Sequence, residues 1–322
     1  MATNKKEHLQ NVLETHRMKH VQNLVDKFKT KRNEVKEALE AHYGSNIYYS
    51  FDSGSFKKRT AINTKFDLDV VVPFKKDSFE TLEKMYDSLY DFLYEEYQDV
   101  TEEIRKQTVS IGLIFEEDED GDKICLDIVP GRELNQDQYS EDNKLNLFVY
   151  RKYGIFSSST HIQTNIQAQI DHIKAKENER KIIRLLKIWN NNDGKEYKSF
   201  LLELITIKAF EKEDISGNLW EKLEKVMEYI KDKVAEDGFK LIDPGNSNND
   251  LMDTLEDWEK TNLSNRMETM LERINSNSDN IKSYFPTNKD FEDDDKSSNS
   301  SGYGIKTGGA AYSTPPKNER FG

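Results

Sequence analysis

The sequence contains little cysteine and no long apolar run. Cys125 is the single cysteine among 322 residues, so a disulfide framework within the chain is excluded, and a lone thiol is typical of a reducing cytosol. No apolar stretch approaches the roughly 20 residues that a membrane-spanning helix needs. The first eight residues are too polar for a signal peptide. These absences predict a cytoplasmic protein without membrane contact.

The composition is that of a globular protein with a polar surface. Hydrophobic residues make up 35% and charged residues 33% of the chain. A chain of this length can bury a large core, either as one bilobal domain or as two intimate ones. The net charge of −13 argues against a protein that coats nucleic acid.

Two acidic residues stand two positions apart in an apolar, β-branched segment. Phe66 to Val72 is predicted to be a strand, and Asp67 and Asp69 then project from one face because side chains alternate. Carboxylates about 7 Å apart along a strand repel each other unless a cation lies between them. The pair therefore predicts a site for a hard divalent ion such as Mg²⁺, although such pairs also occur in surface turns.

A third carboxylate lies in a similar context. Asp127 is the single acid of the short apolar segment Lys123 to Pro130, which follows an acidic turn from Glu116 to Asp122. An unpaired carboxylate is costly to bury, so Asp127 either faces solvent at a strand edge or completes the metal site with Asp67 and Asp69. We expect the second.

Gly54 and Ser55 precede the acidic pair by eleven residues and favour phosphate binding. A glycine can bring backbone N–H groups close to a phosphate because no Cβ is in the way, and Ser55 adds a hydroxyl donor. A phosphate-binding turn next to a paired-carboxylate metal site indicates nucleotidyl transfer.

These motifs resemble those of the DNA polymerase β-like nucleotidyltransferases, and more narrowly of the cGAS/DncV-like nucleotidyltransferases of bacterial anti-phage (CBASS) operons. The matching residues, in order, are Gly54, Ser55, Thr60, Asp67, Asp69 and Asp127. Three later segments are also similar to that family: 184–190 with Lys187, 198–204 with Ser199, and 241–249. The matches cover roughly residues 45 to 250.

The resemblance implies a fold, an activity and a set of roles. The fold would be α+β and bilobal, with a mixed sheet lobe and a helical lobe braced by a long N-terminal helix. The activity would be synthesis of a cyclic di- or trinucleotide second messenger from NTPs (ATP and possibly GTP, UTP or CTP), with two Mg²⁺ or Mn²⁺ ions. Asp67 and Asp69 would hold both ions and Asp127 the acceptor-side ion, while Gly54, Ser55, Lys187 and Ser199 would bind the donor phosphates.

Three alternatives remain open from the sequence. The chain could make linear oligonucleotides, add nucleotides to RNA, or be an inactive nucleotide-binding regulatory module. Lys187 in turn could simply lie on the solvent side of its helix.

The periodicity of apolar residues predicts the order of elements. Residues 5–42 read as one long amphipathic helix, because Val21, Leu24, Val25 and Phe28 recur at helical spacing. We then expect a strand at 46–52, a helix at 78–97, a hairpin of 108–115 with 123–129, and helices from 161 onward. The predicted helices there are 166–189, 198–212, about 218–235 and 251–274.

We divide the chain into three parts on this basis. Residues 1–150 would form the brace helix and the catalytic core, residues 151–287 the helical lobe, and residues 288–322 a flexible tail. The last part is acidic and then rich in Ser and Gly, so it cannot bury enough apolar surface to offset its ordering entropy.

Two partner predictions come from the ends of the chain. Residues 1–40 hold nine Lys or Arg and six Asp or Glu, a local charge of +3, and Lys29, Arg32 and Lys36 share one helix face. They form either a solvated face or, as the resemblance to cGAS and oligoadenylate synthetase allows, a groove for an activating RNA or DNA. Gly322 is the last residue of the tail, and some members of the resembled family are joined to target molecules through their C-terminal residue by ubiquitin-type enzymes. Gly322 is therefore either simply the end of a polar tail or such an attachment point.

Overall fold

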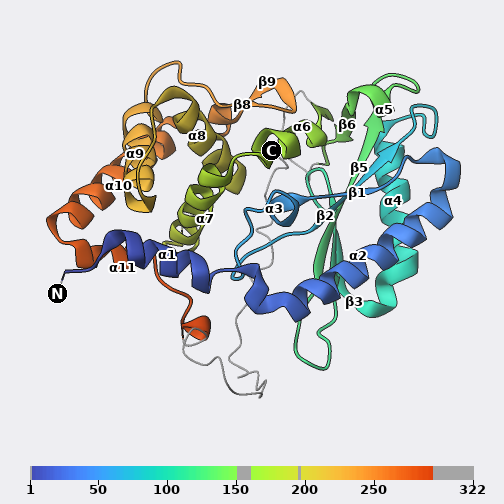
Figure 1. The fold of residues 1–322 in the computed structure, drawn as a ribbon. Helices are drawn as coiled ribbons and strands as arrows, with labels where there is room; N and C mark the ends of the chain where they lie inside the picture. Colours follow the sequence, from blue (N-terminus) through green and yellow to red (C-terminus); the bar gives the residue numbers. More distant parts are fainter. Residues whose placement is uncertain (1, 151–160, 195–196, 293–322) are drawn as a thin grey trace.

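The protein has two lobes that lie side by side, a sheet lobe and a helical lobe (Figure 1). The computed structural model describes residues 2–150, 161–194 and 197–292. Two consecutive helices, α1 (Lys5–Thr15) and α2 (Gln22–Tyr43), run past both lobes along one edge of the molecule. This arrangement confirms the predicted α+β, bilobal fold class.

The sheet lobe is built on a seven-stranded mixed sheet. Strands β2 and β5 run parallel to each other and all other pairs are antiparallel. The order is β1-β2-β5-β4-β3, and β6 pairs with both β5 and β7. The strands are β1 (Phe51–Ser53), β2 (Asp69–Phe74), β3 (Thr101–Lys106), β4 (Ile111–Phe115), β5 (Cys125–Glu133), β6 (Leu145–Phe148) and β7 (His161–Thr164).

Helices cover both faces of this sheet. Val70 and Val72 of β2 pack in one cluster with apolar residues of α2 and of α4 (Leu82–Tyr97). Val71 faces the other way and packs with Ile166 and Ile170 of α6 (Ile166–Lys174). Alternate residues of β2 therefore face different layers, and the α6 side is the side toward the helical lobe.

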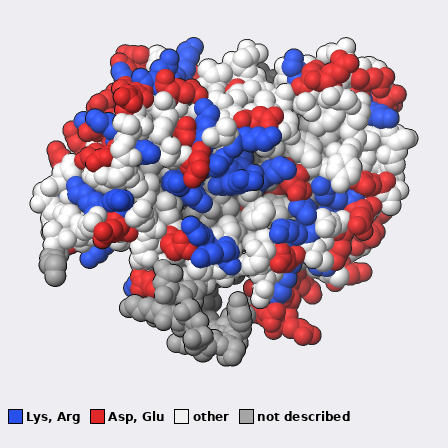
Figure 2. Space-filling view, viewed as in Figure 1, with Lys and Arg blue, Asp and Glu red and all other residues white. Residues whose placement is uncertain are grey.

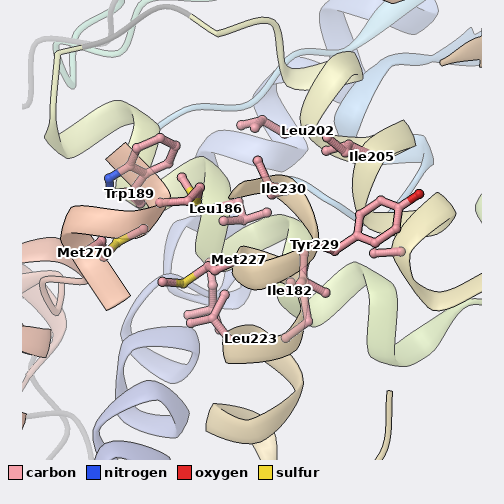
Figure 3. Packing of buried hydrophobic residues seen from close by; sticks show 14 of the residues in the cluster. Ile182, Leu186, Trp189, Leu202, Ile205, Leu223, Met227, Tyr229, Ile230 and Met270 are labelled. Carbon is pink, nitrogen blue, oxygen red and sulfur yellow. The ribbon is translucent and has the colours of Figure 1, made fainter. Parts of the chain in front are cut away.

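The helical lobe has its own core, shown in Figure 3. Buried residues of its four long helices pack together, and Leu9 and Val12 of α1 join them. The helices are α7 (Glu177–Asn192), α8 (Ser199–Lys212), α9 (Leu219–Lys233) and α10 (Asp257–Ser276). Within the described ranges, no helix is long and apolar enough to cross a membrane.

Short elements complete the fold. Asp243 is buried in the hairpin of β8 (Ile242–Asp243) and β9 (Asn246–Asp250), where it accepts hydrogen bonds from Gln169 of α6 at 3.0 and 3.1 Å. The hairpin belongs to the segment 241–249 singled out by resemblance, and this bond ties it to α6. The remaining short helices are α3 (Gly54–Lys57), α5 (Tyr139–Asp142) and α11 (Ile281–Tyr284).

The prediction of one helix over residues 5–42 is wrong, because the helix is interrupted at His16 and Arg17. Asn63 donates its backbone N–H to His16 O at 3.2 Å and its side-chain amide to Thr15 O at 2.9 Å. These carbonyls are among those left without partners at the end of a helix. A residue 48 positions away thus stabilises the end of α1, and α2 can take a separate direction along the sheet.

Several other predicted boundaries also differ. The strand predicted for 66–72 begins at Asp69 and the strand predicted for 46–52 covers Phe51–Ser53. The helix predicted from 78 begins at Leu82, because the Thr81 hydroxyl accepts a hydrogen bond from Lys84 N and caps the helix. The stripe over 166–189 is two helices, α6 and α7.

Two strands were not predicted. β3 was assigned to no element, and β7 was expected to be helical. Both are held by pairing with other strands, β3 with β4 and β7 with β6, which local periodicity does not reveal. The sheet therefore includes residues beyond 150. Most of the predicted tail, 293–322, and with it Gly322, lies outside the described residues.

A buried ion pair joins the two lobes near α3. Lys58, directly after α3, lies 3.1 Å from the Glu203 carboxylate of α8, and both side chains are largely buried. The Lys58 ammonium also lies 4.4 Å from the centre of the Phe200 ring. The pair thus links an element of the sheet lobe to one of the helical lobe, as do the packing of Ile62 in the core of the helical lobe and the hydrogen bond of Lys187 to Thr60.

We expect Lys58→Met to destabilise the protein by about 3 kcal/mol or more, because it leaves the Glu203 carboxylate buried without its partner. The double variant Lys58→Met/Glu203→Leu should recover most of this loss, since neither charge remains. Urea unfolding of the three proteins measures the difference. Equal stability of the single variant and the wild type would contradict the role of the pair.

A second prediction concerns the break between α1 and α2. His16 is buried and donates from Nδ1 to Val12 O at 2.9 Å, and burial lowers the pKa of its imidazole. The folded state thus prefers neutral His16, so its contribution to stability is present above the ordinary pKa of about 6.5 and is lost as pH falls through the folded pKa. The melting temperature of His16→Asn, which keeps a donor, should fall less between pH 7.5 and 5 than that of the wild type. Parallel curves would exclude His16 as a titrating group.

Candidate functional site

The centre of the site is the pairing of β2 with β5. Their parallel register places Asp69 opposite Asp127 and Val71 opposite Val129. Since residues two apart share a face, both carboxylates lie on the face that carries Val71 and Val129, toward α6 and the helical lobe. The structure therefore brings together two carboxylates that are 58 positions apart, as the sequence predicted.

Gly54 lies directly against Asp69. Ser53 of β1 pairs with Asp69, and the chain then turns at Gly54, which has a φ of +80°. A Cβ on Gly54 would lie 2.9 Å from Asp69 Oδ2 and 3.1 Å from Asp67 O. Both the left-handed backbone and the close approach to the carboxylate thus require glycine at this position.

Asp67 does not lie in the strand, contrary to prediction. Its Oδ1 accepts a hydrogen bond from the backbone N–H of Ser55 at 2.9 Å and another from the Ser55 hydroxyl. Asp67 therefore bonds to the turn after β1 instead of to a neighbouring strand. The two predicted groups, the Gly-Ser turn and the acidic pair, are in direct contact.

Lys187 reaches this turn from the other lobe. It is buried on α7, and its Nζ donates to the Thr60 hydroxyl at 3.3 Å. The Thr60 backbone N–H in turn donates to Ser55 O at 2.9 Å. The alternative that Lys187 lies on the solvent side of its helix is therefore wrong, and its ammonium group lies close to Gly54 and Ser55.

Ser199 is the first residue of α8, one turn before Glu203. Positions i and i+4 share a helix face, and Glu203 bonds to Lys58 at the end of α3. Ser199 therefore lies on the face of α8 that carries Glu203. Asn190, the last residue of the segment 184–190 that was singled out by resemblance, donates to Tyr197 O within the helical lobe.

One contact to the acidic group was not found from the sequence. Gln107 donates from Nε2 to Asp127 Oδ1 at 2.8 Å. A glutamine after a short strand has no distinctive spacing in the sequence. The signal that could have found it is Gly112, because a glycine inside an apolar strand segment often marks a place where another group approaches closely.

The donor chemistry of the site suits divalent ions. Asp67, Asp69 and Asp127 supply hard carboxylate oxygens, the ligands that Mg²⁺ and Mn²⁺ take, and the space beside Asp69 is open only because Gly54 has no Cβ. These three residues could therefore hold the ions. The described residues contain a tighter acidic group elsewhere, Asp118, Asp120 and Asp122, whose ligand atoms lie within 4.8 Å of one another.

That second group already has a cation from the protein. The Lys27 ammonium of α2 lies 2.6 Å from a carboxylate oxygen of each of the three aspartates. Lys27 of α2 thus offsets one of the negative charges of the acidic turn between β4 and β5.

The predicted nucleic-acid-binding residues also have acidic partners. Lys29 pairs with Asp26, while Arg32 and Lys36 both pair with Asp52. Figure 2 shows Lys and Arg side chains gathered in the middle of the viewed face, around the position of α3 in Figure 1. The strongest basic surface in this view is therefore nearer to α3 than to the predicted face of α2.

No family model matches the chain. A curated relative, the cyclic AMP-AMP-AMP synthase of Escherichia coli (strain MS 115-1), is 25% identical over 211 residues, which cover 62% of this chain and 61% of the relative. The match thus spans about three fifths of that protein's length.

Solved structures share the fold over most of their length. The structure of E. coli MS115-1 CdnC with ATP has a TM-score of 0.64 at 19% identity and covers 86% of this chain and 92% of its own. The Bradyrhizobium diazoefficiens CD-NTase CdnG in complex with GTP has a TM-score of 0.67 at 14% identity, with 88% and 95% covered. The chain thus shares the fold of these CD-NTase structures and is similar in sequence to the cyclic AMP-AMP-AMP synthase.

Proposed function

We propose that the chain is a metal-dependent nucleotidyltransferase that joins nucleoside triphosphates into a cyclic di- or trinucleotide and releases pyrophosphate. The observation that carries the proposal is the register of β2 and β5, which sets Asp69 opposite Asp127 beside the Gly54–Ser55 turn. The related cyclic AMP-AMP-AMP synthase and the CD-NTase structures with ATP and GTP support it. ATP is accordingly the first substrate to test.

The reaction follows from the placement of these groups. The 2′- or 3′-hydroxyl of an acceptor nucleotide forms a new P–O bond to the α-phosphorus of the donor, and the bond to pyrophosphate breaks. A final transfer within the linear product closes the ring. Ions bound by Asp67, Asp69 and Asp127 would supply Lewis acidity toward the hydroxyl and the phosphates.

The other residues of the site bind and orient the donor. Ser55 offers its backbone N–H and its hydroxyl, which bond to Asp67 in this structure and could turn to phosphate oxygens. Lys187 offers a buried ammonium group beside Thr60, where a positive charge stabilises the negative charge of the phosphates. Ser199, on the same face of α8 as Glu203, would add a hydroxyl from the helical lobe.

The product distinguishes the candidate activities. Purified protein is incubated with all four NTPs and Mg²⁺ or Mn²⁺, treated with phosphatase, and examined by mass spectrometry. A cyclic product has no terminal phosphate and resists phosphatase, whereas a linear oligonucleotide loses its 5′-triphosphate. Nucleotide binding without any product would instead indicate an inactive regulatory module.

We expect Asp67→Ala/Asp69→Ala to lower product formation by more than about 100-fold, because even indirect metal-site changes cost 10- to 100-fold. The variant should still fold, since the removal of two clustered negative charges offsets the loss of the hydrogen bonds that Asp67 accepts from Ser55. Asp214→Ala/Asp237→Ala, at two exposed positions, is the matched control. Full activity of the site variant would exclude the metal assignment.

Ser55→Ala and Lys187→Ala should each reduce activity less than this double variant does, with a higher KM for the donor NTP. Each removes one phosphate contact and leaves the three carboxylates in place. A variant with wild-type KM and kcat would remove its residue from the site.

Activation by RNA or DNA through Lys29, Arg32 and Lys36 is a separate prediction, which rests on the local charge of +3 over residues 1–40. Changing the three to Glu should abolish stimulation by duplex RNA or DNA, and stimulation of the wild type should fall steeply with salt. Asp52→Asn is the control, because it removes the acid that Arg32 and Lys36 share but keeps their charges. Full activity without any polymer would contradict the prediction.

A further inference from the structure

A space in strand β4 lies directly beside Asp127. Gly112 is the antiparallel partner of Asp127, and a Cβ on Gly112 would lie 3.3 Å from Asp127 Oδ1. The same Cβ would come within 3.0 Å of Gln107 Nε2, closer than such atoms approach one another. It would also lie 3.3 Å from Nε of Arg105, the residue of β3 that pairs with Gly112. The bare backbone of Gly112 thus leaves room beside Asp127 for the Gln107 amide and the Arg105 side chain.

The amide uses that room to reach Asp127. Gln107 follows β3 and precedes β4, so its side chain crosses Gly112 and donates from Nε2 to Asp127 Oδ1 at 2.8 Å. The hydrogen bond joins two residues that are 20 positions apart. It passes over Gly112 of β4, the strand that pairs with β5.

The orientation of the amide is itself fixed. Ser110 donates from its hydroxyl to Gln107 Oε1 at 3.2 Å, which leaves Nε2 as the end that faces Asp127. The Gln107 backbone N–H donates to Ser110 O at 2.9 Å. The buried Tyr86 hydroxyl lies 2.8 Å from Gln107 O and 2.7 Å from Ser110 O. Ser110 of the turn and Tyr86 of α4 therefore hold the Gln107 amide in place.

We propose that Gln107 is a positioning residue that sets the orientation of the Asp127 carboxylate for metal binding, and that Gly112 provides the space for it. The role of Asp127 rests on the proposed function. A carboxylate with one oxygen in a fixed hydrogen bond loses rotational freedom, and partners of this kind orient metal ligands and raise metal affinity. The competing explanation is that Gln107 only stabilises the turn between β3 and β4.

Metal binding separates the two explanations. Mn²⁺ binding to the full-length protein, with a non-hydrolysable ATP analogue present, is measured from the electron paramagnetic resonance signal of free Mn²⁺. Gln107→Leu, which keeps the bulk of the side chain and loses the donor, should weaken binding of at least one Mn²⁺ by about 10-fold or more. The Mn²⁺ concentration for half-maximal product formation should rise by a similar factor. Asp127→Ala serves as the reference for full loss of that ion.

A second variant removes the contact without removing the glutamine. Gly112→Ala should displace the amide and weaken Mn²⁺ binding as Gln107→Leu does. In the Gln107→Leu background, Gly112→Ala should add little further loss, because the two changes break the same contact. Gln98→Leu, the same replacement at an exposed position, is the matched control for the side-chain change.

The outcomes decide the proposal. Wild-type Mn²⁺ affinity in Gln107→Leu, with or without a lower melting temperature, overturns it in favour of a structural role. Unchanged Mn²⁺ binding in Asp127→Ala also overturns it, since Asp127 would then hold no ion. A further outcome is that the wild type binds Mn²⁺ but forms no product, while Gln107→Leu and Asp127→Ala bind Mn²⁺ more weakly than it does. In that case the inference about Gln107 stands and the proposed reaction fails.

Discussion

The parallel pairing of β2 with β5 is the constraint on which the rest of the site depends. Its register sets Asp69 opposite Asp127 on the face toward α6. A slip of one residue would move Asp127 to the opposite face, into the layer of α2 and α4, because the side-chain period is two. The apolar neighbours Val71 and Val129 prevent the slip, since it would also exchange the residues that pack on each face. The hydrophobic core of the sheet lobe thus determines the geometry of the acidic residues.

The second constraint is the contact between the lobes. Two lysines cross between them near the Gly54–Ser55 turn, Lys58 to Glu203 and Lys187 to Thr60. Each lobe has its own core, and Ile62, from the segment after α3, packs in the core of the helical lobe. This packing and the buried Lys58–Glu203 pair together hold Lys187 near Thr60. A donor nucleotide bound at the turn would therefore contact groups from both lobes, and its binding is coupled to their relative position.

The interrupted N-terminal helix shows why the predicted elements were only partly right. The apolar spacing in α1 and α2 is helical in both, and both helices form. The break at His16 arises from Asn63, which bonds to the end of α1 from a distant part of the chain. The late start of β2 has a similar origin, because Asp67 bonds to Ser55. The helical character of the periodic segments was predicted correctly, whereas the breaks within them and the ends of the elements were not.

The sequence alone determined the fold class and the chemistry of the site. Gly54, Ser55 and the three aspartates carry that information in their types and order, since few side chains bind metal ions or approach phosphates. Only the tertiary structure decided that Asp67 leaves the strand, that Lys187 is buried beside Thr60, and that Gln107 crosses Gly112 to Asp127. Each of these depends on a contact between residues far apart in the chain. Local periodicity describes which neighbours share a face, whereas the pairing of strands and the docking of lobes decide which distant residues meet.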